Sequence, residues 1–254
     1  MKIDLSNEIT ELDIELFNNV EITELLCNEN ELESLPREIG NLINLKILSC
    51  YDNQIESLPR EIANLTNLQI LNCISNDIES LPSEIGNLIN LRELICSYNQ
   101  IKSLPIEIAN LTNLQILDCW HNKIESLPSE IGNLVNLLEL HCSGQIKSLP
   151  SEIGNLISLR ELDCDYNKIK LLPREIANLT NLQILDCSHN EIKLLPTEIG
   201  NLINLQKLYC DNNQIVLLPS EITKLINLQI LDYSNNPIEH IPPNMMRFIQ
   251  RLKN

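Results

Sequence analysis

Nine cysteine thiols are the groups whose type and spacing most readily suggest chemistry. They recur at intervals of 22 or 23 residues and are Cys27, Cys50, Cys73, Cys96, Cys119, Cys142, Cys164, Cys187 and Cys210. A thiolate is both a nucleophile and a zinc ligand, so a catalytic thiol and a ladder of metal sites are the two functions to test. The direction in which each thiol points decides between these functions and a role in packing, and that direction depends on the elements that carry the cysteines.

The cysteines belong to a repeated unit with the pattern LxxLxCxxNxIxxLPxEIxNLxN. Its copies start at Ile22, Leu45, Leu68, Leu91, Leu114, Leu137, Leu159, Leu182, Leu205 and Leu228. The starts are 23 residues apart, except that the copy at Leu137 has 22 residues; it lacks the residue of position 9 and carries Gly144 at position 8. A period of this length predicts a solenoid of stacked modules rather than a globular domain around one active site.

Each copy predicts one strand and one short helix. Positions 4 and 6 are apolar while positions 5 and 7 are mostly polar, which is the alternation of a half-buried strand. Proline at position 15 and glutamate at position 17 predict a short helix or 3-10 turn with the proline as its first residue. Successive coils place their strands in a parallel sheet. Because strands pack closer than helical segments, we expect the sheet on the concave side of a horseshoe.

The unit resembles the leucine-rich repeat LxxLxLxxNxL, and its second half, LPxEIxNLxNL, is similar to the Ras-group leucine-rich-repeat proteins of plants and animals. The resemblance covers nearly the whole chain and implies an α/β leucine-rich-repeat solenoid. It departs from the family at position 6, where cysteine replaces leucine. By analogy alone, the resemblance suggests a small GTPase or a phosphatase-linked protein as partner, because a fold does not by itself specify a function.

We interpret the cysteines as small hydrophobic core residues, since position 6 points inward between the apolar positions 4 and 11. The histidines His121 and His141 stand at positions 8 and 5, and residue 5 faces opposite to residue 6. We therefore predict neither a metal site nor a cofactor. Nine stacked thiols, the lack of a secretory leader in the first ten residues and the lack of an apolar run of about 18 residues predict a cytoplasmic protein without a membrane span.

Two further ladders follow the same period. The asparagines of position 9 are predicted to satisfy backbone groups of adjacent coils; they are Asn30, Asn53, Asn76, Asn99, Asn122, Asn167, Asn190, Asn213 and Asn236. Regular glutamates at position 17 are more typical of helix capping and solubility than of acid–base catalysis. The net charge of −17 argues against nucleic acid and anionic membranes as partners and favours a neutral or basic protein.

We expect one domain, residues 1–254, made only of this array. Residues 1–21 form a degenerate N-terminal copy, residues 22–244 form ten repeats, and residues 245–254 form a capping helix. The helix is indicated by Met245, Phe248, Ile249 and Leu252, which share one helical face. In the copy at Leu137, Gly144 favours a kink or a tightened turn, because glycine permits backbone angles that other residues resist.

The candidate binding residues are those that vary at positions 3, 5, 7 and 8, on the exposed side or the edge of the sheet. These positions hold the only tryptophan and most of the tyrosines and histidines, and such rings are typical of binding hot spots. Drift at positions that the fold leaves free is the alternative interpretation. The predicted partner-binding residues are Tyr51, Ile95, Tyr98, Trp120, His121, His141, Asp163, Asp165, Tyr166 and Tyr209.

No catalytic constellation is apparent in the sequence. His121, His141 and Asp118 could approach one another on the sheet, but the cysteines point inward and no serine nucleophile is evident beside them. We therefore predict a protein that is not an enzyme and that binds another protein on its concave face, as a scaffold or regulatory subunit in intracellular signalling. The alternative is a structural array, or a decoy that mimics a host repeat protein, with no dedicated ligand.

Overall fold

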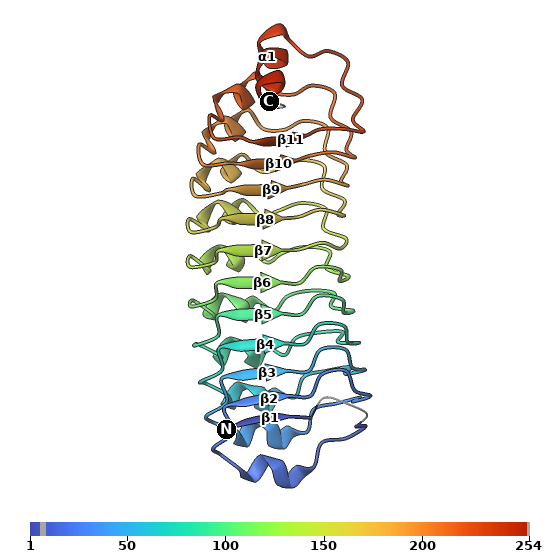
Figure 1. Ribbon diagram of the computed structural model, residues 1–254, viewed down its shortest axis with the longest axis vertical. Coiled ribbons are helices and arrows are strands. Elements are labelled where there is room, and N and C mark those ends of the chain that lie inside the picture. The colour runs from blue at the N-terminus through green and yellow to red at the C-terminus, as the bar shows by residue number, and fades with distance from the viewer. Residues whose placement is uncertain (6–8, 253–254) are drawn as a thin grey trace. The chain divides into compact units, whose positions relative to one another are not determined.

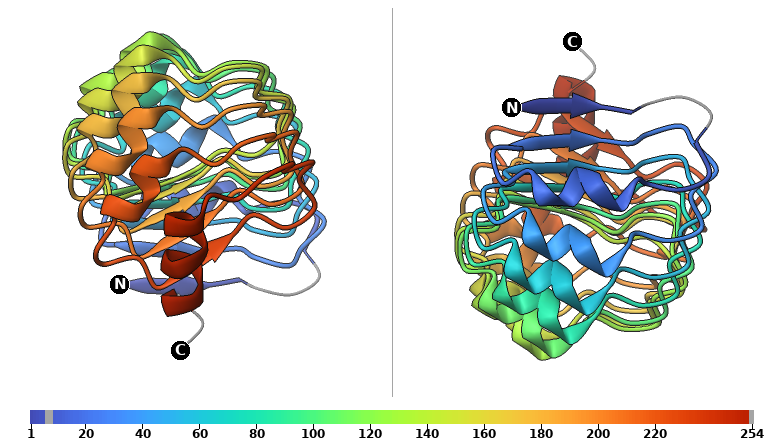
Figure 2. Two further views of the ribbon diagram at one scale, coloured as in Figure 1. Left: turned by 90° about the horizontal axis from the view of Figure 1, so that it is seen from above. Right: turned by 90° about the horizontal axis from the view of Figure 1, so that it is seen from below.

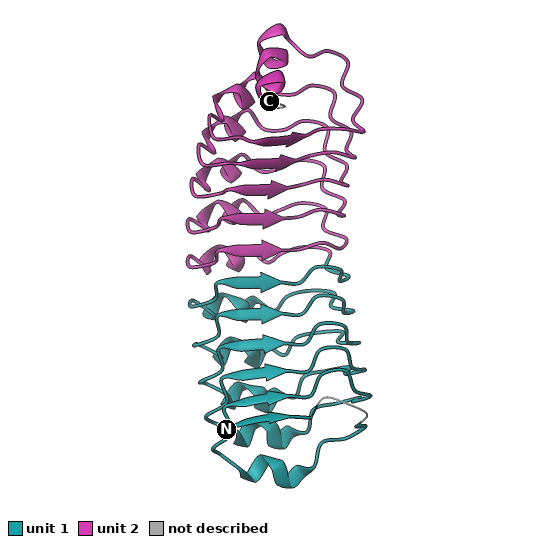
Figure 3. Cartoon of the chain, in the orientation of Figure 1, with its two compact units in different colours: residues 1–124 teal, residues 125–254 magenta. Residues whose placement is uncertain are grey.

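The computed structural model describes residues 1–5 and 9–252. The chain forms two compact units, residues 1–124 and residues 125–254 (Figure 3). Each unit is a stack of coils in which short strands alternate with short helices along the chain (Figure 1). The prediction of one domain with caps at 1–21 and 245–254 stays a prediction. Positions 6–8 and 253–254 of those caps lie outside the described residues.

The first unit contains six strands and five 3-10 helices in its described residues. The strands are β1 (Lys2–Asp4), β2 (Glu24–Leu26), β3 (Ile47–Ser49), β4 (Ile70–Asn72), β5 (Glu93–Ile95) and β6 (Ile116–Asp118). The helices are η1 (Ile14–Asn18), η2 (Arg37–Asn41), η3 (Arg60–Asn64), η4 (Ser83–Asn87) and η5 (Ile106–Asn110).

The second unit continues the same alternation and ends in an α-helix. Its strands are β7 (Glu139–His141), β8 (Glu161–Asp163), β9 (Ile184–Asp186), β10 (Lys207–Tyr209) and β11 (Ile230–Asp232). Its helices are η6 (Ser129–Asn133), η7 (Ser151–Asn155), η8 (Arg174–Asn178), η9 (Thr197–Asn201), η10 (Ser220–Lys224) and α1 (Pro243–Leu252). Helix α1 packs against η10 and β11 and buries Met245, Phe248 and Ile249.

Within each unit the strands pair in parallel, each with its neighbours in sequence, and residues of the same repeat position stand side by side. Leu48 of β3 lies opposite Leu71 of β4, and Leu162 of β8 lies opposite Leu185 of β9. The strands form one layer and the 3-10 helices another, joined by loops (Figure 2). This is the predicted α/β solenoid, and its register turns every repeat position into a row of like side chains.

The core of a coil consists of the apolar residues at positions 1, 4, 6, 11, 14, 18 and 21. In the copy at Leu45, six of these seven residues have no exposed surface, and Leu58 is 5% exposed; the set is Leu45, Leu48, Cys50, Ile55, Leu58, Ile62 and Leu65. Full burial of one leucine or isoleucine side chain stabilises a fold by about 1.5–3 kcal/mol, so these rows supply most of the driving force for stacking.

The helices of the repeats are 3-10 helices, which is one of the two forms that the sequence predicted. The proline of position 15, however, precedes the helix and is not its first residue. Pro59 is the N-cap of η3, with an extended backbone at φ −67° and ψ 145°, and the helix begins at Arg60. At position 19, five copies have glycine. A Cβ at Gly40 would lie 2.7 Å from the carbonyl oxygen of Glu61 in the next coil, so glycine permits the close approach of consecutive helices there.

The cysteines lie in the core, as predicted. All nine thiols are free and without exposed surface. Several of them also donate a weak hydrogen bond to the next coil; Sγ of Cys164, for example, lies 3.3 Å from the carbonyl oxygen of Asp186. Burial raises the pKa of the Cys27 and Cys73 thiols to about 12 and raises the pKa of Cys164 well above its ordinary value.

The asparagines of position 9 connect neighbouring coils through their backbones, which confirms the prediction for this row. Oδ1 of Asn190 accepts the N–H of Ile169 at 2.9 Å, and Nδ2 donates to the carbonyl oxygens of Cys164 at 2.9 Å and Cys187 at 3.2 Å. Asn99 makes the same set of bonds with Ile78, Cys73 and Cys96. One amide therefore satisfies buried groups of two successive coils.

The thiols should be inert in the folded protein. Because the thiolate is the species that reacts and these thiols are both shielded and hard to ionise, brief iodoacetamide treatment at neutral pH should leave the central cysteines unmodified. The same treatment in denaturant should label all nine, as mass spectrometry of the intact protein would show. Rapid labelling of several central thiols in the native protein would contradict their core position.

Replacement of a ladder asparagine by leucine should destabilise the stack. Asn190→Leu and Asn99→Leu each leave a buried N–H and buried carbonyl groups without their partner, which costs roughly 1–3 kcal/mol. Urea unfolding should show a lower midpoint for both variants. An exposed asparagine at position 23, such as Asn181, provides the control for the chemical change alone; unchanged midpoints in both ladder variants would mean that the row is not needed for stability.

Candidate functional site

The predicted binding residues lie on the exposed side of the strands or directly after them. We call this surface, formed by positions 3, 5, 7 and 8, the strand face. Tyr51, Ile95, Tyr98, Trp120 and His121 lie on the strand face of residues 1–124. His141, Asp163, Asp165, Tyr166 and Tyr209 lie on that of residues 125–254.

Three aromatic rings form a cluster after β5 and β6. The centroids of Tyr98 and Trp120 are 5.1 Å apart in an edge-on arrangement, and His121 lies 4.7 Å from Tyr98 and 5.0 Å from Trp120. Tyr98 is 46% exposed, so the cluster is open to solvent. Ile95 stands at the end of β5, opposite Asp118. Rings that are already in contact lose little conformational freedom when a partner covers them.

The backbone at position 8, which carries Tyr98 and His121 but not Trp120, is in a left-handed conformation that tyrosine rarely adopts. Tyr98 has φ 53° and His121 has φ 56°; in the second unit Tyr166 has φ 46° and His189 has φ 50°. Left-handed angles disfavour bulky L-residues and are adopted more readily by asparagine, aspartate and glycine. Position 8 holds asparagine in two later copies, Asn212 at φ 51° and Asn235 at φ 54°. Tyrosine at this position therefore costs stability that asparagine would not.

Gly144 does not take the left-handed angle that position 8 has in the other copies, and the kink or tightened turn stays a prediction. No glycine of the described residues has a positive φ, and Gly144 is the residue of position 8 in the shortened copy. Without a residue at position 9, this copy has no turn that needs the left-handed angle. The deletion thus removes the turn conformation that the other nine copies adopt at position 8.

Tyr51 and Tyr209 stand apart from these ring contacts. The Tyr51 hydroxyl donates to Oε1 of Glu29 at 2.8 Å, and this hydrogen bond raises the pKa of the tyrosine. Tyr209 ends β10 and is partly buried in the row of position 5. His141, at the end of β7, lies with Nε2 3.7 Å from Oε1 of Glu161.

A stacked pair of rings in the second unit extends beyond the predicted set. The rings of Tyr166 and His189 are parallel within 8°, with centroids 4.1 Å apart. His189 was not among the predicted binding residues. The signal was present in the sequence, because His189 occupies the same position as Tyr166 in the next copy, and the parallel register places such residues side by side.

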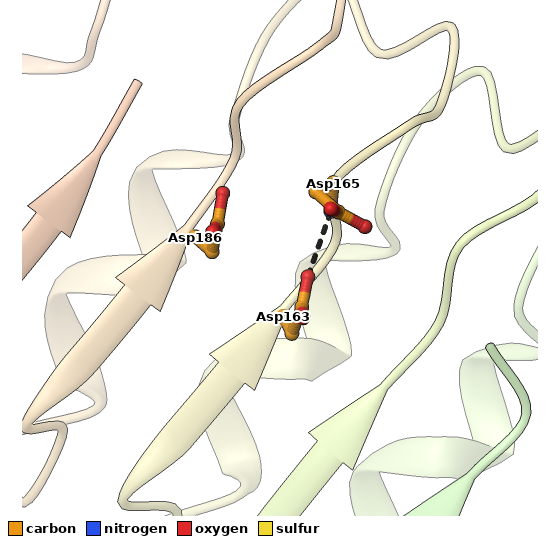
Figure 4. A group of neighbouring side chains, drawn as sticks. All are labelled: Asp163, Asp165 and Asp186. Carbon is orange, nitrogen blue, oxygen red and sulfur yellow. Dashed lines mark hydrogen bonds between the residues drawn. The ribbon is translucent and has the colours of Figure 1, made fainter. Parts of the chain in front are cut away.

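Three carboxyl groups gather where β8 and β9 end (Figure 4). One carboxylate oxygen from each of Asp163, Asp165 and Asp186 lies within 4.8 Å of the other two. Oδ1 of Asp163 accepts the backbone N–H of Asp165 at 3.0 Å. Burial raises the pKa of Asp163 to about 7, with the carboxylates of Asp165 and Asp186 adding to the shift, and burial also raises the pKa of Asp186. A proton near neutral pH relieves this repulsion, as a cation or a basic side chain of a partner would.

Family models identify the repeat. A model described as a leucine-rich repeat region matches residues 9–99 and 83–168, and a second leucine-rich-repeat model matches residues 158–179, 181–202, 204–225 and 227–248. A leucine-rich-repeat protein of Leptospira interrogans shares 35% identity over 97% of this chain and 74% of its own, with a TM-score of 0.68. The chain belongs to the leucine-rich-repeat family.

Other solved leucine-rich-repeat proteins share the fold. A TDR receptor is 27% identical with a TM-score of 0.87, covering 98% of this chain but 45% of its own. The internalin InlF of Listeria monocytogenes is 28% identical with a TM-score of 0.72, over 93% of this chain and 74% of its own. The functional domain of InlJ from the same organism, described as including a cysteine ladder, has a TM-score of 0.75 at 24% identity. A comparison with curated proteins gave no match.

These relatives indicate a protein-binding role for the repeat. Receptors and internalins share its fold, and the receptor kinase HAESA is described in complex with a peptide hormone and a co-receptor.

Among residues 1–5 and 9–252, no helix is both long enough and apolar enough to cross a membrane.

The ionised carboxylate of Asp163 destabilises the folded repeat, because it is partly buried beside two other carboxylates. Replacement of Asp163 by asparagine should therefore stabilise the folded protein at high pH. Between the ordinary aspartate pKa of about 4 and the raised pKa near 7, the folded state binds more protons than the unfolded state. Its stability therefore falls as pH rises through this window, and the variant should lack that loss. We expect a gain of about 1–2 kcal/mol at pH 8 and a smaller gain at pH 5, because the carboxyl remains partly solvated.

Urea unfolding at the two pH values measures this difference. Asparagine keeps the acceptor for the Asp165 N–H, since Asn72 accepts the equivalent bond from Ile74 at 3.1 Å. Asp118→Asn is the matched control, because Asp118 accepts the same bond from Trp120 and a hydroxyl bond from Ser97. An equal gain at both pH values, or an equal pH-dependent gain in the control, would show that the carboxyl group at Asp163 is not the cause.

Proposed function

We propose that the strand face binds a partner protein and that the chain acts as a scaffold or regulatory subunit in intracellular signalling. The observation that carries this proposal is the aromatic cluster of Tyr98, Trp120 and His121, which is open to solvent and in which Tyr98 has a left-handed backbone that tyrosine rarely adopts. Neutral substitution at position 8 would favour residues that adopt left-handed angles easily, such as asparagine and aspartate. A side chain that costs stability at an exposed position is better explained by a contact that it makes with a partner.

The relatives give the proposal its class of ligand. HAESA, 27% identical over 92% of this chain and 41% of its own, is described with a bound peptide hormone and a co-receptor. Because the matched part is less than half of that receptor, only binding of a protein or peptide is transferred to this chain. By analogy with the Ras-group repeat proteins, a small GTPase or a phosphatase-linked protein is the class to test first.

The carboxylates of the second unit favour a basic contact surface on the partner. Asp163, Asp165 and Asp186 form one group, and Asp211 and Asp232 add to the effect of burial in raising the pKa of the Cys210 thiol beside them. A basic side chain would neutralise this repulsion when it binds. We also propose a cytoplasmic location, consistent with nine reduced thiols, and no enzymatic role, because these thiols are buried and hard to ionise.

Truncation of the cluster should abolish partner binding without unfolding the protein. Trp120→Ala alone should cost at least roughly 2 kcal/mol of binding free energy if the ring is a hot spot. The double variant Tyr98→Ala with Trp120→Ala should lose partners in a quantitative pull-down from the native cell. The matched control is Ile89→Ala with Ile106→Ala, which removes two apolar side chains that are 54% and 58% exposed outside the strand face.

A second variant separates binding from folding. Tyr98→Asn should unfold at the same or a higher temperature, because Asn212 and Asn235 occupy this backbone position in other copies, yet it should bind less partner. Retention of every partner by the folded double variant, or equal loss in the control, would remove the case for the strand face. That result would favour the structural or decoy array instead.

A further inference from the structure

A second surface runs along the loops that follow the strand face, at positions 12 and 13. We call the exposed residues of position 12 the edge row. In the first unit the edge row is Glu33, Glu56, Glu79 and Lys102. In the second unit it is Glu125, Lys147, Lys170, Lys193, Val216 and Glu239. The proposed function does not use these residues.

Like charges are stacked one coil apart in the edge row of the first unit. The backbone N–H of Glu56 donates to the carbonyl oxygen of Glu33 at 3.3 Å, and that of Glu79 donates to Glu56 at 3.3 Å. These bonds hold three carboxylates in register on neighbouring coils. Like charges directly opposite one another destabilise the pairing of neighbouring segments. A cationic surface that covered this row would remove the repulsion and stabilise the stack.

The second unit repeats this arrangement with the opposite sign. Lys147, Lys170 and Lys193 occupy the edge row of three successive coils. Lys147 pairs with Glu125 at 3.0 Å and Lys102 with Glu79 at 2.8 Å, but all four side chains are more than 60% exposed, and such pairs contribute little. The chain, with a net charge of −17, thus concentrates lysines at one row of one unit.

The order of charges in the edge row is antisymmetric: reversal of the order gives the opposite charge at every place. From Glu33 to Lys193 the row reads Glu, Glu, Glu, Lys, Glu, Lys, Lys, Lys. Reversed, and with each sign exchanged, it reads the same. A second copy that runs in the opposite direction therefore offers an opposite charge at every coil: Glu33 faces Lys193, Glu56 faces Lys170, Glu79 faces Lys147, and Lys102 faces Glu125.

Shape supports the same pairing at position 13. The copies up to Ser148 have serine there, whereas the next three have Leu171, Leu194 and Leu217, which are 60%, 50% and 47% exposed. The smaller serines border a hollow of about 540 Å³ in the first unit, lined by Glu56, Ser57, Asp77, Glu79, Ser80, Gln100, Lys102 and Lys123. In the antiparallel register Leu171 comes to Ser57 and Leu194 comes to Ser34.

We propose that the edge row of residues 1–124 in one copy packs on the edge row of residues 125–254 in a second copy of this chain. Both rows repeat once per coil, so one pair in register brings the others into register. The smallest assembly joined by this contact is a dimer. At position 10 this register contains one like-charged pair, Glu31 with Glu191, and otherwise neutral or opposite neighbours. The dimer is stabilised by exposed ion pairs and few leucines, so it is weak and sensitive to salt.

Charge exchange tests the proposal directly. Sedimentation equilibrium of the wild-type chain from about 1 to 100 µM at low salt should show a monomer–dimer equilibrium that shifts to monomer as salt is added. The variants Glu33→Lys/Glu56→Lys/Glu79→Lys and Lys147→Glu/Lys170→Glu/Lys193→Glu should each dimerise at least about tenfold more weakly. Mixed together, the two variants should form a heterodimer, because one row is then basic except at Glu125, the other is acidic except at Lys102, and these two residues face each other in the antiparallel register.

Two controls keep the result interpretable. Lys46→Glu/Arg92→Glu/Arg160→Glu changes the net charge as much as the variant of Lys147, Lys170 and Lys193 does. Its residues are at position 2, away from the edge row, so it should leave dimerisation unchanged. Leu171→Ser/Leu194→Ser introduces the residue that earlier copies carry, so it should fold normally and weaken the dimer. A monomeric wild type throughout this range, undiminished dimerisation of the triple variants, or failure of the folded variants to pair with each other would overturn the proposal.

Discussion

The asparagine amide of position 9 is the interaction on which the stack depends. The apolar rows favour burial of any kind, but they do not fix which coil residue faces which, because burial is not directional. Asn190 does so by accepting from one coil and donating to that coil and its own. Since an unpaired buried backbone group is costly, one register is strongly preferred. That register in turn makes rows of the thiols, the rings on the strand face and the charges on the edge.

A repeat this regular separates what can be varied from what cannot. Inward positions are nearly constant, and the exposed positions carry most of the differences between copies. The strand face of the first unit gathers rings at Tyr98, Trp120 and His121, and that of the second gathers carboxylates at Asp163 and Asp186. The two surfaces differ in chemistry although the backbone beneath them is the same. Under the proposed function, ring contacts at one unit and charge at the other would together select the partner.

The sequence predicted the fold because the pattern of apolar residues is local and periodic. The inward direction of the cysteines and the role of the asparagine row follow from the same alternation. The sequence did not reveal the left-handed angle at Tyr98, because tyrosine does not favour that angle and only the surrounding turn imposes it. It also missed the contact of Tyr166 with His189 and the gathering of Asp163 with Asp186, which depend on how neighbouring coils orient their side chains. At Gly144 the sequence could not settle the backbone angle, because glycine permits a left-handed angle without requiring it.

The glycines of position 19 have a consequence for how such a chain can change its length. A Cβ added at Gly40 or Gly86 would lie 2.7 or 2.6 Å from a carbonyl oxygen of the following coil, whereas the intervening copy has Ala63. The approach is as close at Gly132, whose successor has glycine (Gly154), and at Gly200, whose successor has threonine (Thr223). The contact is made to the glutamate of position 17, which all of these successors share, so a glycine coil accepts any of them. An array can therefore gain or lose a coil directly after a glycine coil without a compensating change at position 19.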